Sequence, residues 1–197
     1  MDFDSTIFKL SQNGKRIDYG IMQGNEKIVF IKSGAGSDYK GYQDKYVKMA
    51  LRLHARGGYT VISASNPGTN ESTFDVDKAV IEEYIIERGF KKYELNLVGA
   101  SNGAYQNVCL ANQLNDVKKT LNINMPLMIN FQKAMSMLLK LGETEKIFVY
   151  GTADPSADYI PFLETMKMPN FKVVCINGAD HQFIGMLDEF IALSDLI

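Results

Sequence analysis

The stretch that decides the fold of this chain reads Gly99-Ala100-Ser101-Asn102-Gly103. It matches the pattern G-x-S-x-G, and it lies between an apolar run that ends at Val98 and a helical pattern that begins near Gly103. A serine in a strained turn from strand to helix needs small residues on both sides, because bulky side chains would collide with the turn. The pattern therefore predicts that the hydroxyl of Ser101 stands above the edge of a sheet.

Short apolar runs alternate with longer helical patterns on both sides of this turn. The runs at 28–31 and 147–150 are continuously apolar, which is typical of strands that helices cover on both faces. Two closely spaced strands followed by strands separated by helices predict an α/β fold, with a three-layer, mostly parallel twisted sheet, an antiparallel start and helices on both faces. The predicted strands are 17–22, 27–32, 59–64, 93–98, 120–124, 146–150 and 171–176, and the predicted helices are 38–56, 72–88, 103–114, 128–141 and 184–196.

Composition and charge exclude several classes of protein. The 197 residues are 46% hydrophobic and 22% charged, which predicts one globular domain over 1–197, with a short lid-like helical insertion around 125–145. The net charge of −2 gives no reason to expect nucleic acid or an anionic membrane as a partner. The acidic first residues and the lack of a long apolar run favour a cytoplasmic protein. Cys109 and Cys175 fall in a predicted helix and a predicted strand, so we expect buried thiols in a reducing compartment.

On these residues the chain resembles the α/β-hydrolase fold family, serine esterases and lipases with a minimal cap, along most of its length. The segment 13–19 followed by 27–31 is similar to the opening hairpin and third strand of that family. Ser33-Gly34-Ala35-Gly36 falls where the family usually has His-Gly and its oxyanion loop. Ser65-Asn66-Pro67-Gly68 falls where it often has an Asp-x-Pro-Gly turn. Both stretches depart from the commonest family pattern.

The resemblance implies a catalytic triad in the family's order of nucleophile, acid and histidine. Asp154 ends a stretch, 151–154, that follows a predicted strand like the family's acid loop. His181 ends a similar stretch, 178–181, after the last predicted strand. Serine is a poor nucleophile at neutral pH, so a neutral imidazole must accept its proton while a carboxylate fixes the tautomer of the ring. Ser101, His181 and Asp154 would take these three roles.

Three further residues compete for these roles or have to be placed elsewhere. Asp158, four residues after Asp154, remains an alternative for the acid. Asp180 is expected to point away from the ring of its neighbour His181. His54 lies between Arg52 and Arg56 in a predicted helix and is expected on its solvated face.

The resemblance also implies an oxyanion hole made by the backbone amides of Ala35 and Asn102, with Gly34 and Gly36 next to the substrate. We expect no cofactor, because the glycine-rich loop lacks both nucleotide-binding patterns, and no metal, because the cysteines and histidines lack ligand spacing. The methionines of 125–137 fit either core packing or an adaptable acyl pocket. With one helix between the strands that flank it, the site is expected to be shallow and to suit small esters.

The sequence therefore predicts an α/β-hydrolase that cleaves a small-molecule carboxylic ester or thioester through an acyl-enzyme. Two alternatives remain at this point. One is a non-catalytic small-molecule-binding domain that retains the fold, and the other is an acyltransferase that uses the same triad. The sequence leaves the acyl and alcohol groups and the oligomeric state open.

Overall fold

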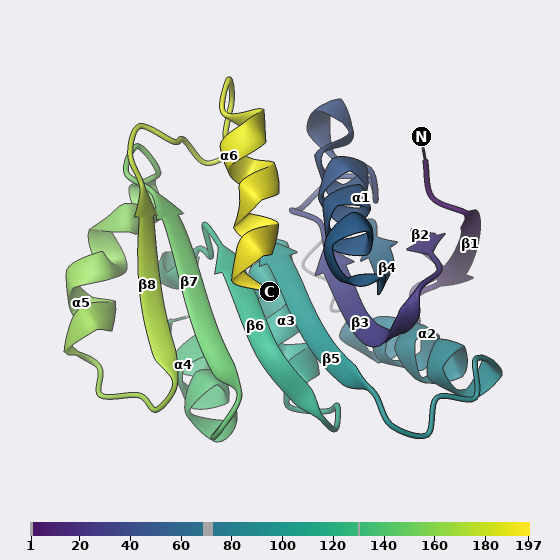
Figure 1. Ribbon diagram of the computed structural model, residues 1–197. Coiled ribbons are helices and arrows are strands. Elements are labelled where there is room, and N and C mark those ends of the chain that lie inside the picture. The colour runs from purple at the N-terminus through teal and green to yellow at the C-terminus, as the bar shows by residue number, and fades with distance from the viewer. Residues whose placement is uncertain (1, 69–72, 130) are drawn as a thin grey trace.

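A computed structural model describes residues 2–68, 73–129 and 131–197 (Figure 1). Their strands form one sheet with the order β1-β2-β4-β3-β5-β6-β7-β8. Strand β2 pairs antiparallel with both of its neighbours, and all pairs from β4 to β8 are parallel. The strands are β1 (Ser5–Leu10), β2 (Arg16–Met22), β3 (Asn25–Lys32), β4 (Tyr59–Ala64), β5 (Glu94–Ala100), β6 (Val117–Ile123), β7 (Glu145–Gly151) and β8 (Phe171–Ile176).

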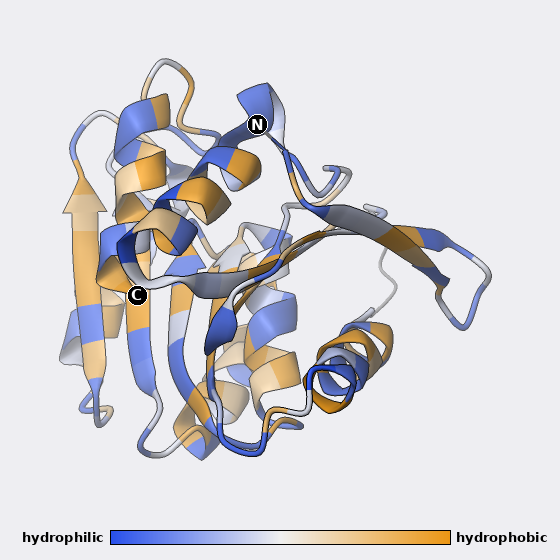
Figure 2. Ribbon diagram, turned by 45° about the vertical axis from the view of Figure 1, so that its right-hand side comes forward, coloured by the Kyte–Doolittle hydropathy of each residue, from blue (hydrophilic) through white to orange (hydrophobic). Residues whose placement is uncertain are grey.

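The sheet lies between two layers of helices, as Figure 1 shows. One layer contains α1 (Lys45–Gly57) and α6 (Leu187–Ala192), and its core contacts the sheet through residues such as Met49 and Phe190. The other layer contains α2 (Phe74–Glu87), α3 (Asn102–Ala111), α4 (Phe131–Lys140) and α5 (Ile160–Thr165). Figure 2 shows polar and apolar residues mixed along these helices. Helices α1 and α4 each bury one side, whereas α3 is buried along nearly all of its length. The predicted three-layer, mostly parallel fold with an antiparallel start is confirmed.

The register of the parallel strands brings their carboxyl ends together at one edge. Lys32 at the end of β3 pairs with Ala64 of β4 and Gly99 of β5. On the other side, Ile123 at the end of β6 pairs with Ala100 of β5. The loops that follow these strands therefore meet above the same edge of the sheet, where sites in such folds lie.

Some predicted elements differ in their bounds, and a few were missed. The helix predicted from residue 38 begins at Lys45, after the short 3-10 turn η1 (Tyr42–Asp44), because Gln43 and Asp44 have left-handed φ angles of 53° and 57°. The start predicted for the second helix, residue 72, lies outside the described residues. Strand β1 was missed because it is exposed along nearly all of its length and its apolar residues, Ile7, Phe8 and Leu10, do not alternate strictly with polar ones. Helix α5 has six residues, too few for a periodic pattern.

The segment 125–145, predicted as a lid-like insertion, divides into two parts. The 3-10 turn η2 (Leu127–Ile129) lies beside the turn η3 (Pro155–Tyr159) that follows β7. Helix α4 instead packs on α3, and its buried residues Ala134 and Leu138 belong to the core on that face of the sheet. It is therefore the crossover helix between two parallel strands and forms part of the core layer, not a cover for the strand ends.

The prediction of two buried thiols is half wrong. Cys109 in α3 is buried, but Cys175 in β8 is exposed. Strand β8 forms the edge of the sheet, so fewer neighbours cover it than cover the central strands.

Among the described residues, no helix combines the length and the apolar character that crossing a bilayer requires.

A buried ion pair lies beneath the carboxyl ends of the strands. The Nζ of Lys32 lies 2.8 Å from Oδ2 of Asp77 in α2, and both side chains are almost fully buried. Asp77 also accepts hydrogen bonds from the hydroxyls of Tyr19 (2.8 Å) and Thr73 (3.0 Å). Burial lowers the pKa of Lys32, and the negative charge of Asp77 opposes this shift. The pair joins α2 to the central strand that leads into the site.

Removing one charge of this pair should destabilise the fold. In Lys32→Met the Asp77 carboxylate stays buried without its counter-charge, so we expect the free energy of unfolding to fall by about 3–5 kcal/mol. Adding Asp77→Asn removes the remaining charge and keeps groups that can bond Tyr19 and Thr73, so it should recover most of the loss. Urea unfolding followed by circular dichroism measures both variants. Equal stability of the single and double variants would contradict the pairing.

Candidate active site

Ser101 occupies a strained turn between β5 and α3. Its φ and ψ angles are 53° and −127°, a combination that non-glycine residues rarely adopt. The flanking glycines are required by space. A Cβ on Gly99 would lie 2.4 Å from the Cα of Ala104, and a Cβ on Gly103 would lie 2.3 Å from the carbonyl oxygen of Ser33. The turn thus has the geometry expected of it, with small residues where the chain passes closest to itself.

His181 connects Ser101 to Asp154. Its Nε2 lies 2.8 Å from the Oγ of Ser101, and its Nδ1 contacts Oδ2 of Asp154. The Asp154 carboxylate is buried, whereas the imidazole is partly exposed. The three loops that follow β5, β7 and β8 therefore bring a hydroxyl, an imidazole and a carboxylate into one hydrogen-bonded series.

Asp154 also begins the turn η3. Its other oxygen, Oδ1, accepts a hydrogen bond of 2.6 Å from the backbone N–H of Ser156, and Pro155 takes the first position of the turn. An aspartate before a proline is a common start of a turn, and the same carboxylate here also contacts the histidine. One residue thus combines a structural contact with a contact to the ring.

The other candidates lie elsewhere. Asp158 is exposed on η3, and Asp154 is the carboxylate that contacts the imidazole. The Oδ1 of Asp180 accepts hydrogen bonds from the N–H groups of Gln182 (3.0 Å) and Ile184 (2.9 Å), so this carboxylate holds its own loop. His54 is exposed on α1, as expected.

The loop 33–36 lies directly against the turn of Ser101. A Cβ built on Gly34 would be 3.5 Å from the Cβ of Ser101. Gly36 has a φ of 75° and donates its N–H to the carbonyl of Asn66 at 3.0 Å. Among the described residues, the N–H groups of Ala35 and Asn102 have no hydrogen-bond acceptor. Two backbone donors are thus unpaired in the two segments that meet at Ser101.

Sequence reasoning missed the side chains that hold this loop to α3. The Nδ2 of Asn66 donates to the carbonyl of Ser33 and to the Oδ1 of Asn102, both at 3.1 Å. Gln106 donates to the same Oδ1 at 2.9 Å, and its Oε1 lies 2.6 Å from the hydroxyl of Thr73, which shares its one proton between Gln106 and Asp77. The signal for Asn66 was its place in the turn after β4, where an asparagine follows a buried strand.

Asn124 was missed as well. It follows β6 directly, is 1% exposed, and has hydrogen bonds to the loops after β7 and β8. The signal for Asn124 was a polar residue at the end of a buried strand.

A lysine lies close to the histidine loop. Lys45, the first residue of α1, is 8% exposed, and its Nζ lies 4.3 Å from the ring centroid of Phe190. Burial lowers the pKa of Lys45 to about 8, and the negative charge of Asp180 opposes this shift. The Lys45 amine therefore lies in a largely apolar setting beside the loop that carries the histidine.

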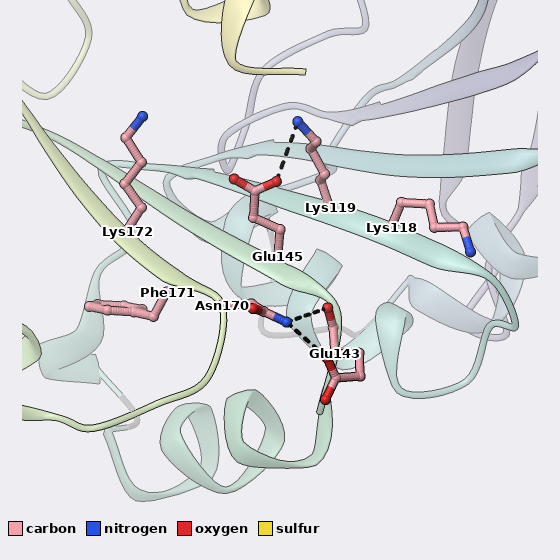
Figure 3. Close-up of a pocket in the computed structure, with 7 residues that line it drawn as sticks. All are labelled: Lys118, Lys119, Glu143, Glu145, Asn170, Phe171 and Lys172. Carbon is pink, nitrogen blue, oxygen red and sulfur yellow. Dashed lines mark hydrogen bonds and ion pairs between the residues drawn. The ribbon is translucent and has the colours of Figure 1, made fainter.

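A cavity of about 500 Å³ lies at the opposite end of the strands (Figure 3). Most of its lining is charged, and two of its residues, Lys119 and Glu145, form an ion pair of 3.3 Å. The lining residues come from the amino ends of β6, β7 and β8 and the residues just before them: Lys118, Lys119, Glu143, Glu145, Asn170, Phe171 and Lys172. This cavity is therefore separate from the Ser101 site.

In the described part of the chain, no three His, Cys, Asp or Glu side chains gather as metal ligands would.

Comparisons with solved structures identify the fold. An α/β serine hydrolase homologue from Coxiella burnetii superimposes with a TM-score of 0.72 at 17% identity, covering 98% of this chain and 97% of that one. A dienelactone hydrolase from Anabaena variabilis gives 0.72 at 17% identity over 97% and 94% of the two chains. A lidless α/β serine hydrolase from Xanthomonas campestris gives 0.68 at 20% identity over 97% and 92%. The chain is therefore a protein of the α/β-hydrolase fold.

No family model matches the sequence, and no curated protein matches it by sequence. At these identities the resemblance in structure establishes the fold alone. The chemistry must come from the arrangement of the residues at the strand ends.

The contact between Asp154 and His181 can be tested without any substrate. A ring N–H that donates to a buried carboxylate is protected from exchange and should give a low-field proton NMR signal. Asp154→Ala removes the acceptor, so we expect the signal of His181 to disappear. Asp158→Ala is the matched control, because it removes an exposed carboxylate from the same turn and should leave the signal in place. Persistence of the signal in Asp154→Ala would contradict the contact.

Proposed function

We propose that this protein is a serine hydrolase that cleaves a carboxylic ester or thioester through an acyl-enzyme intermediate. The observation that carries the proposal is the hydrogen-bonded series from Asp154 through His181 to Ser101, with Ser101 in its strained turn. The same three residue types occur in this relation in serine hydrolases of unrelated folds, which shows that the geometry itself suits the chemistry.

The tautomer of the imidazole follows from its two contacts. The carboxylate of Asp154 can only accept at Nδ1, so Nδ1 carries the proton and Nε2 presents its lone pair to the hydroxyl of Ser101. As the Oγ of Ser101 attacks the carbonyl carbon, its proton passes to Nε2. Asp154 then stabilises the imidazolium.

The remaining steps return every group to its starting state. His181 donates its new proton to the departing alcohol or thiol, the bond to that group breaks, and the acyl group remains on Ser101. Water then attacks the acyl carbon while Nε2 accepts one of its protons. The free acid leaves, and the hydroxyl of Ser101 recovers its proton.

The negative oxygen that develops in both attacks needs fixed donors. The free N–H groups of Ala35 and Asn102 lie on the two segments that meet at Ser101, and Asn102 is the first residue of α3. Backbone donors that are already oriented need no rearrangement during the reaction. Gly34 and Gly36 would keep side chains away from the substrate in this loop.

Small, accessible esters are the substrate class that this site favours. Helix α4 is packed in the core layer, and the Xanthomonas neighbour is described as a hydrolase without a lid. The apolar residues beside the acid loop are exposed, with Met128 at 44% and Ile129 at 73%. These residues offer a surface to a short acyl group and do not enclose a long one.

Labelling with a fluorophosphonate tests the nucleophile. We expect the reagent to modify Ser101 in the wild-type protein and to leave Ser101→Ala unmodified.

Ser101→Ala and His181→Ala should each lower kcat for a p-nitrophenyl ester by about four orders of magnitude or more. The double variant should lose little further activity, because the two residues act as a unit. Multiplying losses would mean that the two residues do not act as a unit, and a folded wild-type protein that resists labelling would favour a binding domain.

The length of the acyl chain tests the shape of the site. Across p-nitrophenyl esters from acetate to decanoate, we expect kcat/KM to be highest for chains of about two to four carbons and to gain nothing from longer chains, because an open surface cannot surround them. Steady-state rates at low substrate concentration measure this. A steady rise toward decanoate would instead indicate a deep acyl pocket.

A further inference from the structure

Asn124 holds a central place at the site edge of the sheet. It directly follows β6, which lies between β5, the strand that leads to Ser101, and β7, the strand that leads to Asp154. The residue is 1% exposed and has a φ of 47°. Asparagine tolerates this left-handed conformation better than most residues do. The backbone thus turns sharply here and directs the amide into the layer of loops.

The amide of Asn124 bonds to both loops that supply the acid and the histidine. Its Oδ1 accepts the N–H of Gly151, at the end of β7, at 2.9 Å. Its Nδ2 donates to the carbonyls of Asp180 and His181, at 3.1 Å each. One buried side chain therefore holds the backbone of the histidine residue and the start of the acid loop at fixed positions.

The position of β8 makes this contact important. Strand β8 forms the edge of the sheet, so the loop after it has a neighbouring strand on one side only. Asn124 comes from β6, two strands away, and reaches this loop past the end of β7. The turn of Ser101 depends on the same strand, because the N–H of Ser101 donates to the carbonyl of Ile123 at 2.8 Å. Adjacent residues 123 and 124 thus contact both the serine turn and the histidine loop.

We propose that Asn124 is a positioning residue, which sets the distance and direction of the His181 ring relative to Ser101 through the histidine's own backbone. The proposal concerns catalysis only if the proposed hydrolase function holds. Its structural part, the alignment of His181, stands independently of that function. Asn124 itself contacts no reacting atom, and its effect is transmitted through the His181 carbonyl.

Two substitutions separate the contributions of the amide. Asn124→Gly removes the side chain, and glycine accepts the positive φ without strain. Asn124→Asp keeps an oxygen for the N–H of Gly151 but replaces the two donated hydrogen bonds with acceptors that face carbonyls. If the donated bonds align His181, both variants lose the alignment.

Asn122→Ala is the matched control. Asn122 is a fully buried asparagine two residues earlier on the same strand. Its Nδ2 also donates, to the carbonyl and hydroxyl of Thr120 and to the carbonyl of Ile147. These partners lie within the sheet and away from the loops. The control therefore removes a comparable buried amide without releasing His181.

The first readout is kinetic and uses p-nitrophenyl acetate and a fluorophosphonate. We expect Asn124→Gly and Asn124→Asp to lower kcat and the rate of Ser101 labelling by about 100-fold, because small misplacements of a reacting group have effects of this size. The KM should change by less than about two-fold, since no substrate contact is lost. Asn122→Ala should lower the urea midpoint of unfolding and leave kcat near that of the wild-type protein.

The second readout is the low-field proton of His181, which requires no activity. The chain contains two histidines, and His54 is exposed, so the assignment is simple. We expect the signal in the wild-type protein and in Asn122→Ala, and its loss or broadening in both Asn124 variants.

Two results would overturn the proposal. One is an unchanged kcat and labelling rate in folded Asn124 variants, and the other is an unchanged His181 signal in them. Failure of the proposed function has a different signature, because wild-type Ser101 would then resist labelling. The NMR comparison would still decide whether Asn124 aligns the histidine.

Discussion

The close approach of α3 to the end of β3 is the constraint on which the rest of the site depends. Gly103 lies so near the carbonyls of Lys32 and Ser33 that a methyl group would overlap both. This contact brings the turn of Ser101 against the loop 33–36, so the segments that carry the N–H groups of Ala35 and Asn102 meet at the serine. The strain at Ser101 persists because packing on both sides leaves the chain no room to relax.

Beneath this contact, buried polar side chains form a continuous network. It runs from Lys32 and Asp77 through Thr73 to Gln106, and the amide of Gln106 bonds to Asn102. Such networks are costly to leave incomplete in a low-dielectric interior, so each member restricts its neighbours to one arrangement. The network links the central strand, α2 and α3, and it ends at the residue after the serine.

The sequence was sufficient to predict seven of the eight described strands in their order along the chain, and the resemblance to the α/β-hydrolase family implied the meeting of Ser101, Asp154 and His181. The choice between Asp154 and Asp158 required coordinates, since both follow the same strand and only burial and contact separate them. Asn66 and Asn124 were missed because their partners lie far away in sequence, and their place after a buried strand does not reveal which groups they bond. Strand β1 was missed because its apolar residues do not alternate strictly with polar ones.

The exposed side chains of β1 affect contacts between copies of this protein. Ile7, Phe8 and Leu10 are exposed on an edge strand, and an open edge with apolar side chains invites further strands to add. The guanidinium of Arg16, on β2, lies 4.4 Å from the ring centroid of Phe8. Lys9 of β1 forms an ion pair with Glu83 of α2. These charged groups and their carboxylate partners, Glu83 and Asp18, place polar atoms beside the apolar residues, and charged side chains on an edge strand discourage a further strand from adding there.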